Sequence, residues 1–500
     1  MSTPQASPGD HPPDGGRRHV LDPRARHPDL LVLGGGTAGL VAAQTAASLG
    51  ASVVLVERDA PGGDCLWTGC VPSKTLLAVA HDVARARTTG TRAGLTVTGP
   101  VDFDAVMARV HKAIATIAPV DSVETLEGHG VTVVTGTGVF TGPDRLSVNG
   151  TTLTFQQAMI ATGATPVIPP IPGLAASRAL TSDTVWSLSE LPGRLVVLGG
   201  GSIGCELGQA FARLGSRVTL VEGEQRLLPD EDPRVAELLL AALRADGVDV
   251  RLRQACAGVN DTSVVLADQS IIGFDQVLVA LGRTARTDGL GLDAAGVRTR
   301  ADGTVQVDQT LRTTNPRIWA AGDLTGHPPF THTAGVHASL AVTNALLGLH
   351  RGTTKTAIPR VTFTSPEIAS VGVRAPGPGD ARNLRVATID HDQIDRAVAE
   401  DETAGYSELV LDRRGRVVGA TIVGARAGES IGEAMLAIQN GLTARAIAST
   451  THPYPTFNDG IWNAAILDVR RQLGRAPVRA VIKLLRRIRR IRRNRRNRSR

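Results

Sequence analysis

Two cysteines near the N-terminal end of the chain have a spacing that suits redox chemistry. The segment GGDCLWTGCVPSK places Cys65 and Cys70 five residues apart, with Gly69 before the second sulfur and Pro72 after it. Such a pair can close a disulfide when a glycine kinks the turn, and a helix starting at Pro72 would stabilise a thiolate at Cys70. Two ordinary buried cysteines are the alternative. Because half of the chain's 4 cysteines fall in this window, we interpret the pair as redox-active.

An internal repeat supplies the elements that must position these cysteines. The segment LVLGGGTAGLVAAQTAASLGASVVLVE (31–57) returns as VVLGGGSIGCELGQAFARLGSRVTLVE (196–222), with 14 of 27 aligned positions identical. Each copy combines a strand, a GxGxxG turn, a helix and a second strand ending in Glu, the pattern of a dinucleotide-binding βαβ unit. Two complete copies predict two bound dinucleotides, with each pyrophosphate at a glycine turn and each ribose diol at Glu57 or Glu222. The turn glycines are Gly34, Gly36 and Gly39 in the first copy and Gly199, Gly201 and Gly204 in the second.

The other segments fit around this pair of repeats. Residues 101–118 predict an amphipathic helix, and 130–140 predict strands around Gly136. The runs AMIATGA, VLVALGR and RIWAAGD each predict a strand that ends in a glycine turn, at Thr162-Gly163, Gly282 and Asp323. Alternating apolar runs after residue 359 predict an antiparallel sheet with helices. The sequence therefore predicts an α/β protein with two Rossmann-like domains and a C-terminal α+β domain.

These motifs together make the sequence similar to the class I pyridine nucleotide–disulfide oxidoreductases, the group of dihydrolipoamide dehydrogenase, glutathione reductase and mercuric reductase. The first GxGxxG, CxxxxC-VPSK, ATG, the second GxGxxG, GR, AAGD and a late HP occur in the family's order between about residues 29 and 468. The resemblance implies FAD on the first fingerprint, NAD(P)H on the second, and a C-terminal domain that forms a homodimer. The implied organisation is a flexible extension (1–28), an FAD-binding domain (29–165, completed by 285–355), an NAD(P)-binding domain (166–284), a dimerisation domain (356–469) and a basic tail (470–500).

The resemblance also implies roles for individual residues. Cys70 would lie next to the flavin, and Cys65 would be the interchange sulfur that meets the substrate. Lys74 would lie near the reactive nitrogen of the flavin and pair with Glu206, while Asp323 would hold a ribityl hydroxyl. The remaining cofactor-binding residues that we expect are the glycines and glutamates of both fingerprints with Gly136, Thr162, Gly163 and Gly282. We expect no resident metal.

The late motif THPYPTFND supplies the candidate proton carrier. In the family, a His followed by Pro acts as the base for the other subunit's disulfide, and a nearby carboxylate orients it. His452 occupies the His position, and Asp459 is the candidate carboxylate, although the spacing of seven is longer than in glutathione reductase and Asp stands where Glu is usual. A helix-starting His-Pro with a solvent-facing Asp is the alternative interpretation.

These residues predict an FAD-dependent enzyme that passes two electrons between NAD(P)H and a thiol/disulfide substrate through Cys65 and Cys70. Mercury reduction is disfavoured, because no cysteine follows Cys256 and no N-terminal Cys motif exists to deliver the metal. One alternative is an NAD(P)H oxidase or quinone reductase, which Ser202 favours because it replaces the aromatic that gates the nicotinamide pocket in glutathione reductase. Another is a non-catalytic nucleotide-sensing protein. We expect NADH rather than NADPH, because the charge of Glu222 would repel a 2′-phosphate, although the nearby Arg226 weakens this argument.

Composition sets the remaining limits. With 42% apolar and 20% charged residues, a chain of 500 residues is typical of a globular protein of about three domains. The low cysteine content and an N-terminus without an apolar segment predict a cytoplasmic protein, with no secretory signal and no membrane span. The net charge of +7 divides into +15 over 470–500 and −8 over the rest. The tail predicts a basic amphipathic helix that binds an anionic membrane surface peripherally at its inner face, with nucleic acid as a less favoured partner and a solvated tail as the alternative.

Overall fold

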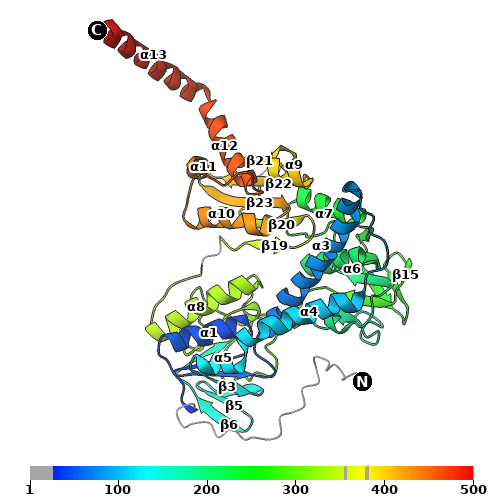
Figure 1. The fold of residues 1–500 in the computed structure, drawn as a ribbon. Helices are drawn as coiled ribbons and strands as arrows, with labels where there is room; N and C mark the ends of the chain where they lie inside the picture. The colour runs from blue at the N-terminus through cyan, green and yellow to red at the C-terminus, as the bar shows by residue number, and fades with distance from the viewer. Residues whose placement is uncertain (1–25, 354–356, 378–381, 499–500) are drawn as a thin grey trace. The chain divides into compact units, whose positions relative to one another are not determined.

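The computed structural model describes residues 26–353, 357–377 and 382–498 (Figure 1). Its internal contacts divide the chain into two units. The first unit contains the residues up to Leu228 together with Leu243–Thr353, and the second contains Pro229–Ala242 together with the C-terminal part of the chain. Most of the predicted extension over 1–28 lies outside the described residues, which begin at residue 26.

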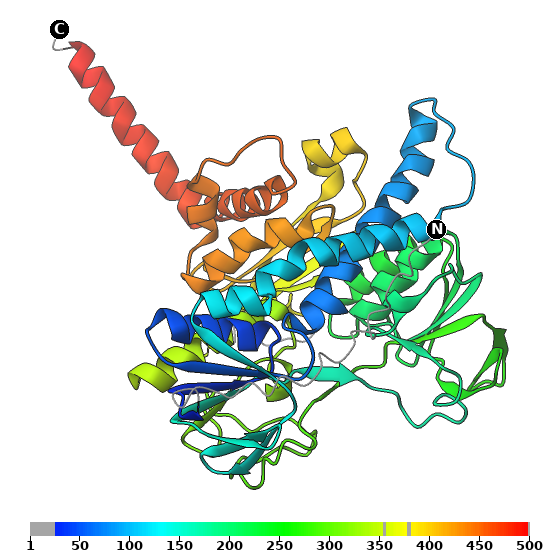
Figure 2. The same cartoon turned by 60° about the horizontal axis from the view of Figure 1, so that its bottom comes forward.

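The first unit contains a parallel sheet that carries the first repeat. Its strand order is β18-β7-β1-β2-β3, with every neighbouring pair parallel. Successive side chains of a strand point to opposite faces. Leu30 and Val32 therefore pack against α1 and α8, whereas Leu31 and Leu33 pack against an antiparallel meander of β4, β5 and β6. Helices α1 and α8 lie side by side (Figures 1 and 2). The bounds are β1 (Leu30–Leu33), α1 (Thr37–Ser48), β2 (Val53–Glu57), β3 (Val131–Thr135), β4 (Gly138–Gly142), β5 (Arg145–Val148), β6 (Thr151–Thr154), β7 (Gln157–Ile160), β18 (Ile318–Ala320) and α8 (Thr331–Leu347).

A second parallel sheet in the same unit carries the second repeat. Its order is β12-β11-β10-β16-β9, again parallel throughout, and α6 packs on it. An antiparallel sheet of β13, β14 and β15 and the antiparallel pair β8–β17 complete the strands. The bounds are β8 (Ala164–Pro166), β9 (Leu180–Thr181), β10 (Arg194–Leu198), α6 (Ser202–Leu214), β11 (Arg217–Glu222), β12 (Asp249–Leu252), β13 (Cys256–Val259), β14 (Ser263–Leu266), β15 (Ile271–Gly273), β16 (Gln276–Val279) and β17 (Arg283–Ala285).

The helix that begins at Cys70 packs against the second repeat. Helix α3 contacts α4 and also α6 of the second repeat. The bounds are α2 (Gly63–Trp67), α3 (Cys70–Arg92), α4 (Phe103–Ile117) and α5 (Val123–Gly128), with short 3-10 turns η2 (Ala118–Asp121), η3 (Val185–Ser187) and η4 (Asp323–Thr325). The helix predicted over 101–118 is confirmed as α4, whose buried face contains Val106, Val110 and Ile114.

The second unit is built on an antiparallel sheet of order β19-β20-β23-β22-β21. Helices α10 and α12 cover it, and their apolar residues join those of the strands in one core. The bounds are α7 (Pro233–Ala245), β19 (Arg360–Thr362), β20 (Glu367–Gly372), β21 (Arg385–Asp390), η5 (His391–Gln393), α9 (Asp395–Glu400), β22 (Tyr406–Leu411), β23 (Val417–Gly424), α10 (Ala427–Gln439), α11 (Ala444–Ser449), α12 (Asp459–Leu473) and α13 (Ala476–Arg498). The predicted fold class, two dinucleotide-binding folds with a C-terminal α+β domain, is confirmed.

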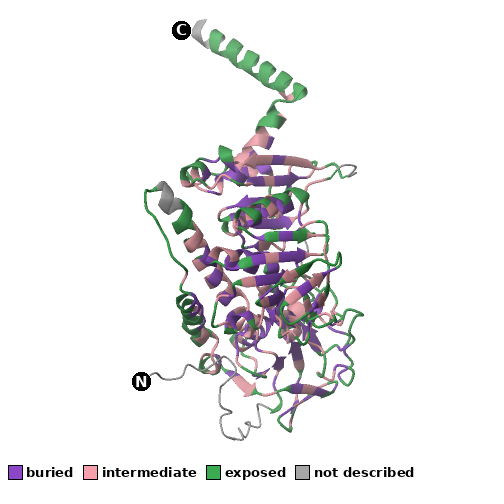
Figure 3. Cartoon of the chain, turned by 90° about the vertical axis from the view of Figure 1, so that its right-hand side faces the viewer, coloured by how far each residue is buried: buried purple, intermediate pink, exposed green. Residues whose placement is uncertain are grey.

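Burial separates the body of the protein from its tail. Buried residues concentrate in the strands and on the helix faces that cover them, whereas α13 is exposed from Arg479 to Asn494 (Figure 3). The basic helix predicted for the tail is thus present as α13. Among the described residues, no helix combines the length and the apolar character needed to cross a membrane.

Candidate active site

Both glycine turns have the geometry of a dinucleotide site. Gly34 has a φ of 102°, and a Cβ there would lie 2.5 Å from the carbonyl oxygen of Ala161, so only glycine fits. Helices α1 and α6 begin directly after Gly36 and Gly201 without a side-chain cap, which leaves first-turn N–H groups for a phosphate. A Cβ on Gly201 would meet nothing within 4 Å, so there is room for a ligand at this turn. The residues present therefore fit two dinucleotides.

The two glutamates of the repeat make equivalent contacts. Oε2 of Glu57 accepts a hydrogen bond from the N–H of Gly35, and Oε2 of Glu222 accepts one from Gly200 at 2.6 Å. Their other oxygens accept hydrogen bonds from Asp59 and Glu224 N–H. Each glutamate therefore fixes its own glycine turn. A ribose diol would share these carboxylates with the main chain.

Cys65 and Cys70 lie at adjoining helix ends. Cys65 is in α2, and Cys70 is the first residue of α3, where the positive end of the helix dipole favours a thiolate. The turn between them requires Gly69, because a Cβ there would lie 2.7 Å from the Asp64 carbonyl oxygen. Both sulfurs are free thiols in this structure, and they hydrogen-bond to each other. The sulfur of Cys70 also lies 3.3 Å from the hydroxyl of Thr331.

The two sulfurs differ in acidity. The hydrogen bond from Cys65 lowers the pKa of Cys70 to about 6, and Thr331 and the charge of Lys74 act in the same direction against burial. The pKa of Cys65 is raised, first by that same hydrogen bond and then by burial and the charge of Cys70. At neutral pH the reduced pair therefore carries one proton, on Cys65, and Cys70 is a thiolate.

The predicted Lys74–Glu206 ion pair is confirmed. Nζ of Lys74, on the first turns of α3, lies 2.9 Å from Oε2 of Glu206 in α6. Glu206 is nearly buried, and its backbone belongs to the helix of the second glycine turn. The pair therefore joins the cysteine segment to the second nucleotide fold within one unit.

The other predicted cofactor residues occupy turns at strand ends. Thr162 donates its hydroxyl hydrogen to the carbonyl of Arg286 at 2.7 Å. Gly163 and Gly282 have positive φ values of 70° and 117°, and Gly136 has one of 153°. Asp323 opens η4, and burial raises the pKa of its carboxyl against the opposing charge of Arg283.

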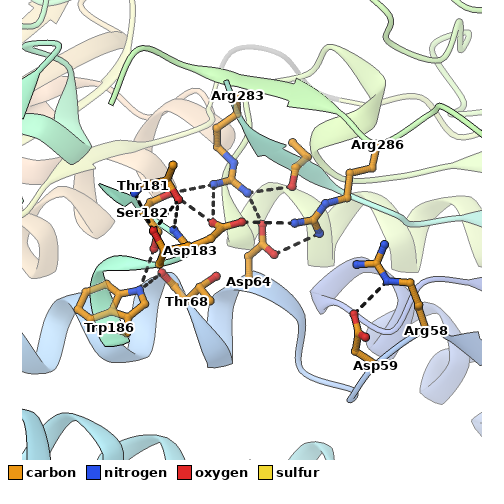
Figure 4. Close-up of polar contacts among 12 residues, drawn as sticks. Arg58, Asp59, Asp64, Thr68, Thr181, Ser182, Asp183, Trp186, Arg283 and Arg286 are labelled. Atoms are coloured by element: carbon orange, nitrogen blue, oxygen red, sulfur yellow. Dashed lines mark hydrogen bonds and ion pairs between the residues drawn. The ribbon is translucent and has the colours of Figure 1, made fainter. Parts of the chain in front are cut away.

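Four charged residues beside the cysteines were not identified from the sequence (Figure 4). Asp64, one residue before Cys65, contacts Arg283 and Arg286, and both arginines also contact Asp183. The partners lie 100 to 222 positions apart in the chain, so no local pattern signals them. The only sequence hint is the presence of two arginines in the GRTAR segment after the second repeat.

His452 pairs with Glu433 rather than with Asp459, the carboxylate that the sequence suggested. Nε2 of His452 lies 2.8 Å from Oε1 of Glu433 on α10, and Nδ1 lies 2.9 Å from the Thr450 carbonyl oxygen. Asp459 instead accepts a hydrogen bond from the N–H of Thr456 at 3.1 Å. Since Asp459 is the first residue of α12, its carboxylate turns back onto the residues that lead into the helix. Glu433, 19 positions before His452, carries no spacing signal in the sequence.

His452 is also more enclosed than its motif suggests. Its side chain is 7% exposed and stacks on Trp462 with ring centroids 5.2 Å apart. The exposed ionisable side chain on this segment is Tyr454, whose hydroxyl donates to Asp395, and that carboxylate raises the pKa of the phenol. Tyr454 lies inside the quoted motif, but the sequence did not signal its contact with Asp395.

Comparison with known proteins identifies the family. A model described as pyridine nucleotide-disulphide oxidoreductase matches residues 28–338, and the dimerisation-domain model of the same family matches residues 358–465. The chain belongs to the pyridine nucleotide-disulphide oxidoreductases. The dimerisation domain indicates a homodimer, and FAD and NAD(P) are typical of the family.

Relatives within the family include enzymes with different names. The chain is 39% identical to a mercuric reductase of Streptomyces lividans, over 87% of this chain and 95% of that protein. It is 34% identical to a dihydrolipoyl dehydrogenase of Bacillus subtilis over the same shares of each. The crystal structure of LpdA from Mycobacterium tuberculosis is similar with a TM-score of 0.81 and 29% identity, covering 87% of this chain and 98% of that one. The protein is thus a flavoprotein disulfide reductase by family.

The acidity of Cys70 gives this oxidoreductase a measurable pH dependence. In the reduced protein, ultraviolet thiolate absorbance should appear with a midpoint near pH 6, because the lowered pKa of Cys70 makes the thiolate present above that pH. Thr331→Val and Lys74→Met should both move the midpoint upward, since each removes a group that stabilises the thiolate. The Cys70→Ser protein gives the baseline. A midpoint near 9.0, the ordinary value, would contradict this assignment.

Proposed function

We propose that this protein reduces a disulfide substrate with NADH, through FAD and the Cys65–Cys70 pair. The observation that carries the proposal is the position of Cys70 at the first residue of α3, the helix whose Lys74 pairs with Glu206 of the second nucleotide fold. The lowered pKa of Cys70 agrees with this position. The overall reaction takes NADH, one proton and RS–SR′ to NAD⁺, RSH and R′SH. The same groups can also run in reverse, as a dihydrolipoamide-like thiol oxidation by NAD⁺.

The side chains of this protein account for the sulfur chemistry. Bound FAD supplies the electron relay between the nicotinamide and the cysteines. Cys65, once deprotonated, attacks the substrate disulfide, so that a mixed disulfide forms and the first substrate thiol leaves. The Cys70 thiolate then attacks the sulfur of Cys65, re-forming the Cys65–Cys70 bond and releasing the second thiol. We propose that His452, oriented by Glu433, carries the proton that these steps move at the disulfide of the other subunit.

We propose that FAD binds to a domain of residues 29–165 and 285–355, and the nicotinamide dinucleotide to residues 166–284. NADH is the proposed donor. Glu222, the last residue of β11, and the exposed Glu224 just after it lie where an adenosine ribose is expected. Two carboxylates would repel a 2′-phosphate more strongly than they would disturb a ribose diol.

A disulfide is a better proposed substrate than Hg(II), despite the similarity to mercuric reductases. Cys65 and Cys70 alone could bind Hg(II) as two thiolates, but delivery of the metal to them would be impaired. Besides Cys65 and Cys70, the chain has Cys205, which is buried, and Cys256 on β13. The chain therefore has no second pair of thiols that could bind a soft metal ion and pass it to Cys65 and Cys70.

A purified-protein assay tests this function. NADH should bleach the flavin with a higher kcat/KM than NADPH, and a panel of disulfides should restore the oxidised spectrum faster than Hg(II) or a quinone. The alternative, a quinone reductase, is favoured only by Ser202, which is exposed at the start of α6. If the Cys65→Ser/Cys70→Ser protein keeps the quinone rate and the wild type turns over no disulfide, the alternative function is correct.

We further propose that the tail binds an anionic membrane surface. Helix α13 presents exposed Val481, Leu484, Leu485, Ile488 and Ile491. Its sequence contains basic residues and no acid between Ala476 and Arg498. A basic helix with an apolar stripe is suited to a lipid interface that combines anionic headgroups with acyl chains.

A further inference from the structure

One short segment of the second nucleotide fold contacts the cysteine loop at both of its ends. The segment Ser182–Trp186 follows β9, the edge strand of the sheet that carries the second repeat. Through the four-residue ion network it reaches Asp64, directly before Cys65. Through Trp186 it reaches Thr68, two residues before Cys70 (Figure 4).

The ion network alternates in charge. Arg283 contacts Asp64 and lies 3.5 Å from Asp183, while Arg286 lies 3.3 Å from Asp64 and 3.6 Å from Asp183. Arg283 also donates to the Ser182 hydroxyl at 3.2 Å and to the Ala164 carbonyl at 2.9 Å. All four charged side chains are between 20% and 33% exposed. Partly buried ion pairs of this kind stabilise a fold little compared with apolar packing, so their value lies in holding a geometry.

Trp186 holds the other end of the loop. Its indole Nε1–H donates to the carbonyl of Thr68 at 2.7 Å and to that of Ser182 at 2.8 Å, and the side chain is buried. The carbonyl of Thr68 belongs to the segment between α2 and α3, which must bring the two sulfurs together. The polar atom of Trp186 is therefore used to anchor the loop main chain.

We propose that the segment Ser182–Trp186, with Arg283 and Arg286, is a positioning clamp that keeps Cys65 and Cys70 at disulfide-forming separation. The inference rests on the proposed function, since it assumes that the pair cycles between dithiol and disulfide. A disulfide demands a narrow range of Cα separations, whereas a dithiol does not. Holding both ends of the loop therefore favours the disulfide over the dithiol. The residues of the clamp act through the cysteines and are positioning residues.

Loosening the clamp should make the disulfide easier to reduce. In the full-length, FAD-loaded protein, Trp186→Phe removes the N–H donor and keeps an aromatic ring, and Asp64→Asn removes one charge and keeps the shape. For each, the dithiol–disulfide equilibrium is measured by equilibration with dithiothreitol redox buffers, alkylation and counting of blocked thiols. We expect the equilibrium constant to shift toward the dithiol by about tenfold, which corresponds to about 30 mV for a two-electron couple.

Matched controls separate positioning from general loosening. Trp319→Phe removes a similar buried indole bond, to Gln157 at 2.9 Å, and Asp275→Asn breaks the ion pair with Arg194 at 2.7 Å. Both should leave the potential unchanged. If the clamp variants shift no more than the controls, the clamp is wrong and the function stands. If wild-type Cys65 and Cys70 form no reducible disulfide at all, the proposed function itself fails. If Trp186→Phe loses its flavin, the equilibrium constants of Asp64→Asn and Asp183→Asn test the clamp in its place.

Discussion

Replacing Cys70 with serine should abolish disulfide reduction while NADH still bleaches the flavin. Serine keeps the size of the side chain but offers no thiolate, so the mixed disulfide on Cys65 has no internal sulfur to release it. Loss of an active-site nucleophile costs about four orders of magnitude or more in kcat. We therefore expect disulfide turnover to fall to background, measured as NADH oxidation in the presence of a disulfide, while flavin bleaching in a single turnover persists.

The rest of the chain offers a control for this substitution. Cys256 is a partly buried free cysteine on β13, outside the cysteine loop, and Cys256→Ser should keep the full rate. A Cys65→Ser protein should also lose turnover, because the substrate disulfide then has no attacking sulfur. If Cys70→Ser retained the wild-type rate with any disulfide, electrons would be leaving from another group and the proposed mechanism would be wrong.

The features predicted correctly from the sequence are those that lie within short segments. A glycine turn, its helix and its two strands occupy 27 residues, and each part has its own propensity, so both βαβ units could be located to within a few residues. The Lys74–Glu206 pair spans 132 positions, and no periodicity predicts it. The prediction of that pair came from the resemblance to a family in which the corresponding lysine and glutamate pair.

The features missed depend on how separate segments pack. Asp459 was chosen as the partner of His452 because it is near in sequence, but it begins a helix and binds main chain instead. Glu433 reaches His452 from α10, since the fold brings that helix against the loop. Asp64 and Asp183 were likewise paired with arginines only by the folding of the chain. Nothing local distinguishes such carboxylates from solvated ones.

Removing the tail should abolish binding to anionic vesicles and leave the redox activity intact. The segment 476–498 carries 11 basic residues and no acid, and each base near an anionic surface contributes about 1 kcal/mol. Full-length protein should therefore cosediment with vesicles that contain phosphatidylglycerol at moderate salt. The truncated form should end at Gly474, because α12 extends to Leu473 and Arg471 on it donates to the Val386 carbonyl at 3.1 Å.

The apolar stripe distinguishes a lipid surface from nucleic acid as the partner of α13. Leu485 and Ile488 are 59% and 39% exposed, and phosphate binding makes no use of them. A Leu485→Ser/Ile488→Ser protein keeps every basic residue, so it should bind vesicles at least tenfold more weakly while its retention on heparin stays unchanged. Burying two such side chains contributes a few kcal/mol, more than this loss requires. Equal cosedimentation of the full-length and truncated forms would rule out the tail as the binding element. Unchanged vesicle binding by the double serine variant, or binding of duplex DNA but not of vesicles by the full-length protein, would show that α13 recognises phosphate charge alone.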